Sequence, residues 1–385
     1  MHSFPRRIML GLFVLLLGGL PGSVSAAQVE NLYQAVVDEE DLDLLETEDE
    51  QESSLAGDGG RQALMRAALA RVLIRLSGTS EVVEDSEVRT ALLEPVQDYV
   101  SRYQVLRGES SGSRLRVRFG EEAVREALWE QDWPVWGRYR PGVVVWVARR
   151  GTGDRNPVSP DMEPDLFEAL ETAAEQYGLP LLMPLMDGTD RDRLSGRNLL
   201  FEDWEQIESA SERYDPDAIL LVRVGEGERG GTRVDWVLRR GGEDRTFSSS
   251  ADGLEGALQA GMERLLAGMA RDYAVEPGRG AAMEAAVEGV RSLEDLARVE
   301  RGLGRLAAVE AVMPARTAGS EARFRFRFRA DPERAAHIVS LLDILEPEEG
   351  ETPERESPAT DSGDRREGED ADQDGSPLLR FTYRP

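Results

Sequence analysis

The sequence predicts a fold of the α/β and α+β class, divided into three successive units. Residues Val143–Ala148 form a fully apolar run of strand length, which is typical of a strand buried on both faces. Residues Leu254–Tyr273 carry apolar side chains along one helical stripe, which predicts a long amphipathic helix. After residue 280 the order strand, helix, strand, strand, helix indicates a split βαβ arrangement.

The N-terminal unit is predicted to be a small α+β domain over residues 27–132, with an acidic insert at 38–60. In the expected strand Arg114–Phe119, the apolar residues Leu115, Val117 and Phe119 alternate with arginines, so one face of this strand is expected to be buried. The expected elements are the strand Asn31–Val37, the helix Arg61–Leu76, a short helix Glu94–Val100, the strands Tyr103–Leu106 and Arg114–Phe119, and the helix Glu121–Gln131.

The middle unit, residues 133–275, is predicted to be an α/β domain with a mixed sheet. It opens with Trp133–Pro141, a stiff aromatic junction, and Gly225–Gly231 is expected to be a hairpin turn. Its expected strands are Val143–Ala148, Leu181–Met183, Ala218–Val224, Arg233–Leu238 and Arg245–Ser249, and its helices are Pro164–Tyr177, Glu202–Tyr214 and Leu254–Tyr273.

The C-terminal unit, residues 276–385, is predicted to be a ferredoxin-like module with a disordered acidic insert at 346–376. The final strand, Pro377–Tyr383, would complete the sheet after this insert. The other expected elements are Ala285–Val290, Ala308–Met313 and Ala322–Arg329 as strands, with Leu293–Leu303 and Pro332–Leu345 as helices.

Residues 1–26 have the features of a cleavable signal peptide. Arg6 and Arg7 precede the apolar run Ile8–Leu20, which is too short to span a bilayer, and small residues place the cleavage near Ala26 or Ala27. We therefore expect a periplasmic mature protein without stable membrane insertion. A twin-arginine signal and an uncleaved membrane anchor are the alternatives.

The charge balance excludes several classes of partner. Removal of the signal leaves 74 acidic and 44 basic residues, a net charge of −30, and such a surface repels nucleic acid and anionic lipid. Asp38–Glu52 holds ten carboxylates and no base, while Glu346–Gly375 holds thirteen acids and three arginines. Both runs are expected to be disordered.

Both acidic runs only partly match a calcium-binding loop. The first lacks the turn glycine and one oxygen ligand, since Leu45 and Glu46 stand at those positions. The second, around Asp370, Asp372 and Asp374, has Phe381 where the closing glutamate belongs. Solvated charge explains both runs without a metal.

Most familiar catalytic chemistries lack their residues in this chain. There is no cysteine, and the only histidine after the signal is His337, which lies in a predicted helix without a nucleophile motif nearby. No lysine is available for a phosphate loop. Paired carboxylates could still hydrolyse a glycosidic bond, and Asp132 with Trp133 and Asp203 with Trp204 are the candidates. We expect no catalytic, cofactor-binding or metal-binding residues.

The aromatic junction is the candidate surface for a partner. Its tryptophan, tyrosine and arginine residues are the types that dominate binding hot spots, although the tryptophans could instead pack the first unit against the second. The candidate residues are Trp133, Trp136, Arg138, Tyr139 and Arg140.

A strand of alternating arginine and phenylalanine, Arg323–Arg329, resembles a platform for stacking nucleic-acid bases. Export and net charge argue against that function, so a strand with phenylalanines in the core is the simpler interpretation. Its arginine face could hold the acidic tail or an acidic partner.

Several segments resemble an exported gammaproteobacterial family catalogued as domain of unknown function number two thousand and sixty-six. The segments that carry the resemblance are Leu73–Gly78, Trp133–Gly137 with Arg140-Pro141, Gly178–Leu182 and Tyr214–Val222. The resemblance spans roughly Val29–Tyr273 and implies an envelope location without assigning an activity. The order of elements in the middle unit is also similar to the small α/β domains of the Tol translocation protein and of outer-membrane activators of peptidoglycan synthesis, which is an analogy of fold alone.

Together these observations favour a soluble periplasmic binding or accessory protein that acts through protein–protein contacts with another component of the cell envelope. A carboxylate-dependent glycan hydrolase and a structural spacer are the alternatives.

Overall fold

The computed structural model describes residues 27–38, 41–42, 58–107, 113–151, 157–227, 230–278, 280–329, 332–348 and 378–384. The predicted signal peptide, most of both acidic runs and the second calcium-like segment lie outside these residues. Within the described residues the fold is of the predicted α/β and α+β class, with three multistranded sheets. No helix of the described part of the chain is long and apolar enough to cross a membrane.

The N-terminal unit is a three-stranded antiparallel sheet of order β2-β4-β3 packed against one long helix. The helix α1 covers the face that carries Leu115, Val117 and Phe119, all at most 3% exposed. Its elements are β2 Gln34–Val37, α1 Asp58–Ser77, α2 Glu81–Glu84, α3 Ser86–Val88, a π-helical turn Arg89–Leu93, α4 Val96–Tyr99, β3 Val100–Arg107, β4 Ser113–Phe119 and α5 Glu121–Glu130.

The limits predicted for the first acidic insert, 38–60, need correction at both ends. Asp41 is buried, and its carboxylate forms an ion pair with Arg71 of α1. The helix α1 already begins at Asp58. Ordered structure therefore enters the acidic segment from both sides.

The middle unit is a five-stranded mixed sheet of order β10-β9-β8-β6-β7. The strand β6 pairs in parallel with β7 and β8, whereas β8, β9 and β10 form an antiparallel meander. Its elements are β6 Val143–Arg149, α6 Pro164–Tyr177, β7 Leu181–Leu182, α7 Gly188–Arg193, α8 Gly196–Leu200, α9 Trp204–Ser211, a 3-10 turn Glu212–Tyr214, β8 Ala218–Glu226, β9 Thr232–Arg240, β10 Glu243–Ala251 and α10 Leu254–Tyr273.

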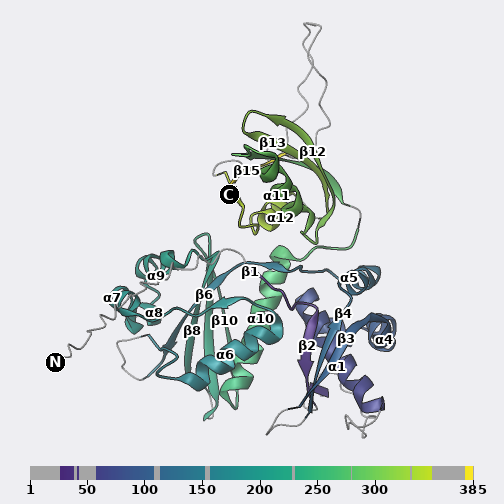
Figure 1. Ribbon diagram of the computed structural model, residues 1–385. Coiled ribbons are helices and arrows are strands. Elements are labelled where there is room, and N and C mark those ends of the chain that lie inside the picture. The colour runs from purple at the N-terminus through teal and green to yellow at the C-terminus, as the bar shows by residue number, and fades with distance from the viewer. Residues whose placement is uncertain are drawn as a thin grey trace, which may run out of the picture.

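Both faces of this sheet are buried, as the apolar run at β6 predicts. Val143, Val145 and Val147 belong to the cluster on one side, where α6 and α10 pack side by side (Figure 1). Val144 and Trp146 belong to a second cluster on the other side, with residues of α8 and α9. The helix α9 begins at Trp204, not at the predicted Glu202, because Glu202 has a φ of 56° that a right-handed helix excludes.

The C-terminal unit contains the predicted split βαβ elements, and its sheet has the order β12-β13-β11-β15-β14. Four of these strands have the order expected of a ferredoxin-like module, but β15 pairs in parallel with β11. The elements are β11 Ala281–Glu288, α11 Leu293–Gly304, β12 Val309–Ala318, β13 Glu321–Phe328, α12 Pro332–Val339, β14 Leu345–Pro347 and β15 Leu378–Tyr383.

The parallel pairing follows from β14, whose first residue was predicted as the end of a helix and whose other two residues were assigned to the disordered insert 346–376, which needs correction at its start. The helix α12 stops at Val339, and Leu345 then pairs with Tyr383 in an antiparallel arrangement. The chain leaves β14 through the second acidic run and returns as β15 between β14 and β11. Because β14 is an additional strand antiparallel to β15, the chain reverses direction once more than in a ferredoxin-like module, and β15 therefore runs parallel to β11.

One cluster of buried side chains passes through all three units, and the C-terminal unit lies above the other two in Figure 1. The link between the first two units includes a short ladder of β1 (Ala27–Gln28) with β5 (Tyr139–Arg140). A single bridge between Val135 and Val275 connects the junction to the end of α10.

The contact of α10 with the middle sheet predicts that alanine substitution at two glycines of this helix changes the free energy of unfolding very differently. A Cβ at Gly261 would lie 2.2 Å from ring atoms of Trp236, whose indole N–H donates to the Ser249 hydroxyl at 2.9 Å. Gly261→Ala is expected to lower the free energy of unfolding by roughly 1–3 kcal/mol because the ring has to shift.

The matched control is Gly268→Ala on the same helix, where a Cβ would meet nothing within 4 Å. That substitution should be neutral or stabilise the protein by up to about 1 kcal/mol. Urea unfolding followed by tryptophan fluorescence measures both variants. Equal stability of the two variants would contradict the packing described.

Candidate functional site

Two of the five residues predicted as a partner surface, Trp136 and Arg140, are buried in the interior of the junction. Trp136 is 1% exposed and Arg140 is 0% exposed, so neither side chain can contact a partner in this structure. The indole of Trp136 stacks on Tyr273 of α10, with ring centroids 5.7 Å apart and an interplanar angle of 8°. For these two residues the prediction is corrected, because the junction packs between the first unit and α10.

Arg140 joins three segments through backbone carbonyl groups. Its guanidinium donates to the carbonyl of Arg75 at 2.6 Å, to Gly178 at 2.9 Å and to Tyr177 at 3.2 Å. It also lies over the ring of Trp136, 4.2 Å from the centroid. Burial, together with the neighbouring Arg75, lowers the pKa of Arg140 to about 9.

Arg75 supports the same connection from α1. Its Nε donates to the carbonyl of Gln176 at 2.6 Å, and its Nη1 donates to the carbonyl of Gln34 at 2.6 Å. The last carbonyls of α6 are therefore bound by two guanidinium groups, which is the end of a helix where positive charge is favourable.

The remaining junction residues are only half-buried, and each has a structural contact. The indole N–H of Trp133 donates to Asp85 at 3.0 Å and lowers the pKa of that carboxyl. Tyr139 lies in β5, opposite Gln28. Arg138 forms an ion pair with Glu121 and lines a cleft, so among the five predicted residues it is the one that reaches a candidate site.

The role of Arg140 predicts a large loss of stability when it is replaced. Arg140→Ala should lower the free energy of unfolding by roughly 3–5 kcal/mol, because several buried carbonyls lose their donor. Arg140→Lys should remain destabilised, since an ammonium cannot bond to carbonyls on both sides as a guanidinium does. Denaturant titration measures the loss, and Arg301→Ala on the surface of α11 is the control, expected within about 0.5 kcal/mol of wild type. Full stability of Arg140→Lys would contradict the role assigned to the guanidinium.

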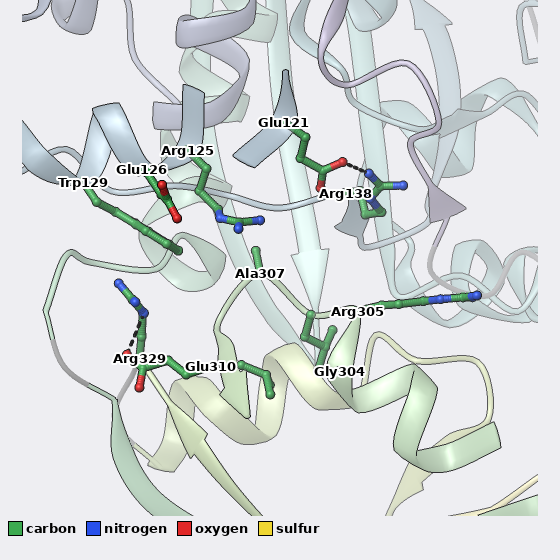
Figure 2. Close-up of a pocket in the computed structure, with 12 residues that line it drawn as sticks. Glu121, Arg125, Glu126, Trp129, Arg138, Gly304, Arg305, Ala307, Glu310 and Arg329 are labelled. Atoms are coloured by element: carbon green, nitrogen blue, oxygen red, sulfur yellow. Dashed lines mark hydrogen bonds and ion pairs between the residues drawn. The ribbon is translucent and has the colours of Figure 1, made fainter. Parts of the chain in front are cut away.

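The cleft lies between α5 of the first unit and the turn from α11 to β12 of the C-terminal unit (Figure 2). Its volume is about 750 Å³. Four arginines, three glutamates and one tryptophan contribute to its walls: Arg125, Arg138, Arg305, Arg329, Glu121, Glu126, Glu310 and Trp129.

Trp129 is held between cations from the two sides of the cleft. The guanidinium of Arg125, one helical turn earlier on α5, lies 5.4 Å from its ring centroid. The guanidinium of Arg329, at the end of β13, lies 4.2 Å away. The indole N–H donates to the carbonyl of Val275 at 3.3 Å, which fixes the ring in place.

The charges of the cleft do not balance pair by pair. Arg138 is bound to Glu121, and Arg329 is bound to Glu310 at 3.0 Å. Within the described residues Arg125 and Arg305 have no carboxylate partner, and the Nε of Arg125 is enclosed without an acceptor. Figure 2 shows the guanidinium of Arg125 pointing into the cleft above Ala307. Such an arrangement can receive an anionic group.

Sequence reasoning identified only Arg138 among the lining residues. The spacing of Arg125 and Trp129 on one helix face was visible, but the turn 304–309 comes from a different unit. The approach of that turn depends on Gly137, where a Cβ would lie 2.8 Å from the Cβ of Ala307. The glycine in the junction motif was therefore the only local signal of this contact.

The other residues considered from the sequence do not form a site in the described structure. His337 is exposed on α12. The Asp203 carboxylate accepts a hydrogen bond from Asn198 at 2.8 Å, and Arg239 covers one face of Trp204 at 4.6 Å. Among the described residues no group of three or more histidine, cysteine, aspartate or glutamate side chains could hold a metal ion. The phenylalanines of Arg323–Arg329 are buried as predicted, at no more than 1% exposure.

Asp217, at the start of β8, is the described carboxylate with the most strongly raised pKa. Asp217 is exposed as a residue, but neighbouring atoms exclude water from much of its carboxyl group, and this desolvation raises its pKa to about 6. The N–H of Gly142 donates to Oδ2 at 2.7 Å and lowers the pKa, whereas the nearby charges of Asp343 and Asp215 raise it. Because the folded state holds this proton above the ordinary pKa of aspartate, ionisation between about pH 4 and pH 6 destabilises the fold.

Asp217→Asn should therefore become more stable relative to wild type as the pH rises from 4.5 to 7. We expect the difference in unfolding free energy between the two proteins to grow by roughly 0.5–1.5 kcal/mol, because asparagine never ionises and solvent screens part of the effect at an exposed residue. Denaturant titrations at both pH values measure it, with Asp244→Asn as the control on a partly exposed, ion-paired carboxylate. A pH-independent difference would contradict the raised pKa of Asp217.

Comparison with known proteins shows that part of this chain is similar to an uncharacterised family. Residues 26–137 match a family described as "Domain of unknown function (DUF8605)". As expected, this part of the chain resembles a family without an assigned function; the match does not test the particular family suggested by the sequence segments. No curated protein matches. A solved structure titled "Crystal structure of uncharacterized protein" shares 18% identity over 34% of this chain and 90% of its own, with a TM-score of 0.17, which carries no argument about fold or function.

Proposed function

We propose that this protein is an exported, periplasmic binding or accessory protein that acts through contacts with another protein of the cell envelope. The cleft between α5 and the turn 304–309 is the proposed binding site. The export signal and the charge of the sequence support the location, and the geometry of the cleft supports the kind of contact.

The observation that carries this proposal is the pair Arg125 and Arg305. Both guanidinium groups lack a carboxylate partner among the described residues, in a chain whose formal net charge is −28. Glu126 of the same cleft has no cationic partner among the described residues, and the four arginines and three glutamates of the lining leave an excess of one positive charge. A carboxylate-bearing segment of a partner fits this site, since a guanidinium binds carboxylate with two parallel hydrogen bonds.

Trp129 is half-buried, so part of its indole remains exposed beside these charges. The combination of an aromatic ring with arginines is typical of the residues that contribute most to protein interfaces. A rigid ring also loses little conformational entropy when a partner binds, because its position is already fixed by Arg329 and Val275.

In-cell cross-linking tests the proposal. A photo-reactive amino acid placed at Glu126, which is exposed at the edge of the cleft, should capture a specific envelope protein. Capture should fall at least about tenfold when Arg125→Gln and Arg305→Gln are combined, because the partner's carboxylates lose their donors.

Arg301→Gln is the matched control, since Arg301 is exposed on the same helix end as Arg305 but does not line the cleft. It should leave capture unchanged. Circular dichroism and denaturant unfolding establish that the double variant is folded. Capture that is independent of the two arginines, or no specific capture, would refute the cleft as the binding site.

A further inference from the structure

The strand β3 is a free edge of the N-terminal sheet. The sheet has the order β2-β4-β3, and within the described structure β3 pairs with β4 alone. Its central residues, 101–105, are all exposed. An edge strand leaves one row of backbone N–H and C=O groups available to a further strand.

The two faces of β3 offer different chemistry. Tyr103 and Val105 are 48% and 44% exposed, on the same side of the sheet as the buried residues Val117 and Leu115 that they pair with. Arg102 and Gln104 point to the opposite side. A strand added at this edge would therefore meet apolar side chains on one face and polar ones on the other.

The polar face of this sheet carries a row of arginines, Arg102, Arg114, Arg116 and Arg118, which we call the arginine row. Arg102 lies directly opposite Arg118 across the two strands, an arrangement in which like charges repel. The side-chain bond of this row within the described residues is from Arg118 to Gln34 Oε1 at 3.4 Å. The Nε of Arg116 is enclosed without an acceptor.

The C-terminal sheet has a similar row of arginines, but most of them form ion pairs with carboxylates. On β13 the exposed Arg327 has no carboxylate partner among the described residues, but Arg323 binds Glu321 at 2.8 Å, Arg325 binds Glu284 at 2.8 Å, and Arg329, just after the strand, binds Glu310. Those carboxylates come from the same sheet. The N-terminal sheet supplies no such carboxylates among its described strands, so its positive charge is left for another molecule.

We propose that β3 is a docking strand for an extended acidic segment of a partner protein. The segment would pair with the exposed backbone of β3, place its acidic side chains over the arginine row and place apolar or β-branched side chains against Tyr103 and Val105. This surface is separate from the cleft at α5, so the two proposals stand or fall independently.

Charge selects the occupant of this edge. An added strand lies about 5 Å from β3 and about 10 Å from β4, which is close to the distance over which salt screens charges at physiological ionic strength. Its acidic residues would therefore attract both Arg102 and the arginines of β4. A second copy of β3 would instead bring two positive rows together, which disfavours self-pairing.

Peptide binding to the mature full-length protein tests this proposal. The probe is a fluorescent peptide of alternating glutamate and threonine, matched to the 8 residues of β3. Anisotropy should show saturable binding that weakens with salt. The combined variant Arg102→Gln and Arg118→Gln should bind at least about tenfold more weakly, whereas Arg327→Gln, an exposed arginine of β13, should bind as wild type.

Two further arms separate strand addition from nonspecific ionic binding. The same peptide with alternate backbone amides methylated should not bind, since pairing with β3 requires its N–H groups. Binding of the methylated peptide as tight as that of the parent would overturn the proposal. Equal competition by inorganic polyphosphate and by the peptide would indicate a general anion surface and would overturn it too.

The chain's own acidic run is the remaining competitor. In a variant with Glu46, Glu48, Asp49, Glu50 and Glu52 replaced by their amides, peptide binding should be unchanged or modestly tighter. Binding that is seen only in this variant would assign β3 to the chain's own segment and would overturn partner docking. Absence of binding in both proteins would overturn it as well.

Discussion

The buried guanidinium of Arg140 is the interaction on which the arrangement of the first two units depends. It receives no carboxylate within the described structure and is instead satisfied by carbonyls from α1 and from the end of α6. Arg75 binds the adjacent carbonyl of Gln176 from the other side. A charge buried in this way is tolerated because the carbonyl dipoles at the end of a helix are themselves without partners, so each group removes the other's cost of desolvation.

This contact also determines where the binding surfaces lie. Because Arg140 and Trp136 are used in the interior, the junction presents Arg138 toward α5 and the C-terminal unit. Gly137 then allows the turn at Ala307 to approach, which completes the cleft around Trp129. The cleft is thus a product of three units that meet, and no single unit contains it.

The distribution of arginine is informative in a protein with so many acids. Many arginines of the described structure bind a carboxylate nearby, as on β13 and around Arg213, where Asp187 and Asp190 converge. Arginines without a carboxylate partner in the described structure line the cleft and the polar face of the N-terminal sheet, and others, such as Arg301 and Arg327, lie singly on the surface. Because like charges repel, the clustering of such arginines in the cleft and on the N-terminal sheet favours binding over a purely structural role.

The periodicity of apolar residues predicts the class of fold and most of the longer helices and strands, because it indicates which faces are buried. Val143–Arg149, Pro164–Tyr177 and Leu254–Tyr273 agree with the predictions almost residue for residue. The short helices α7 and α8 were missed, since their caps at Asp187 and Ser195 fix too few residues to produce a periodic pattern. Tertiary packing alone makes Trp136 and Arg140 interior, aligns β15 parallel to β11 and brings Trp129 against Arg329. These features depend on contacts between residues far apart in the chain, and the local pattern of side chains carries no information about which distant segment will supply the partner.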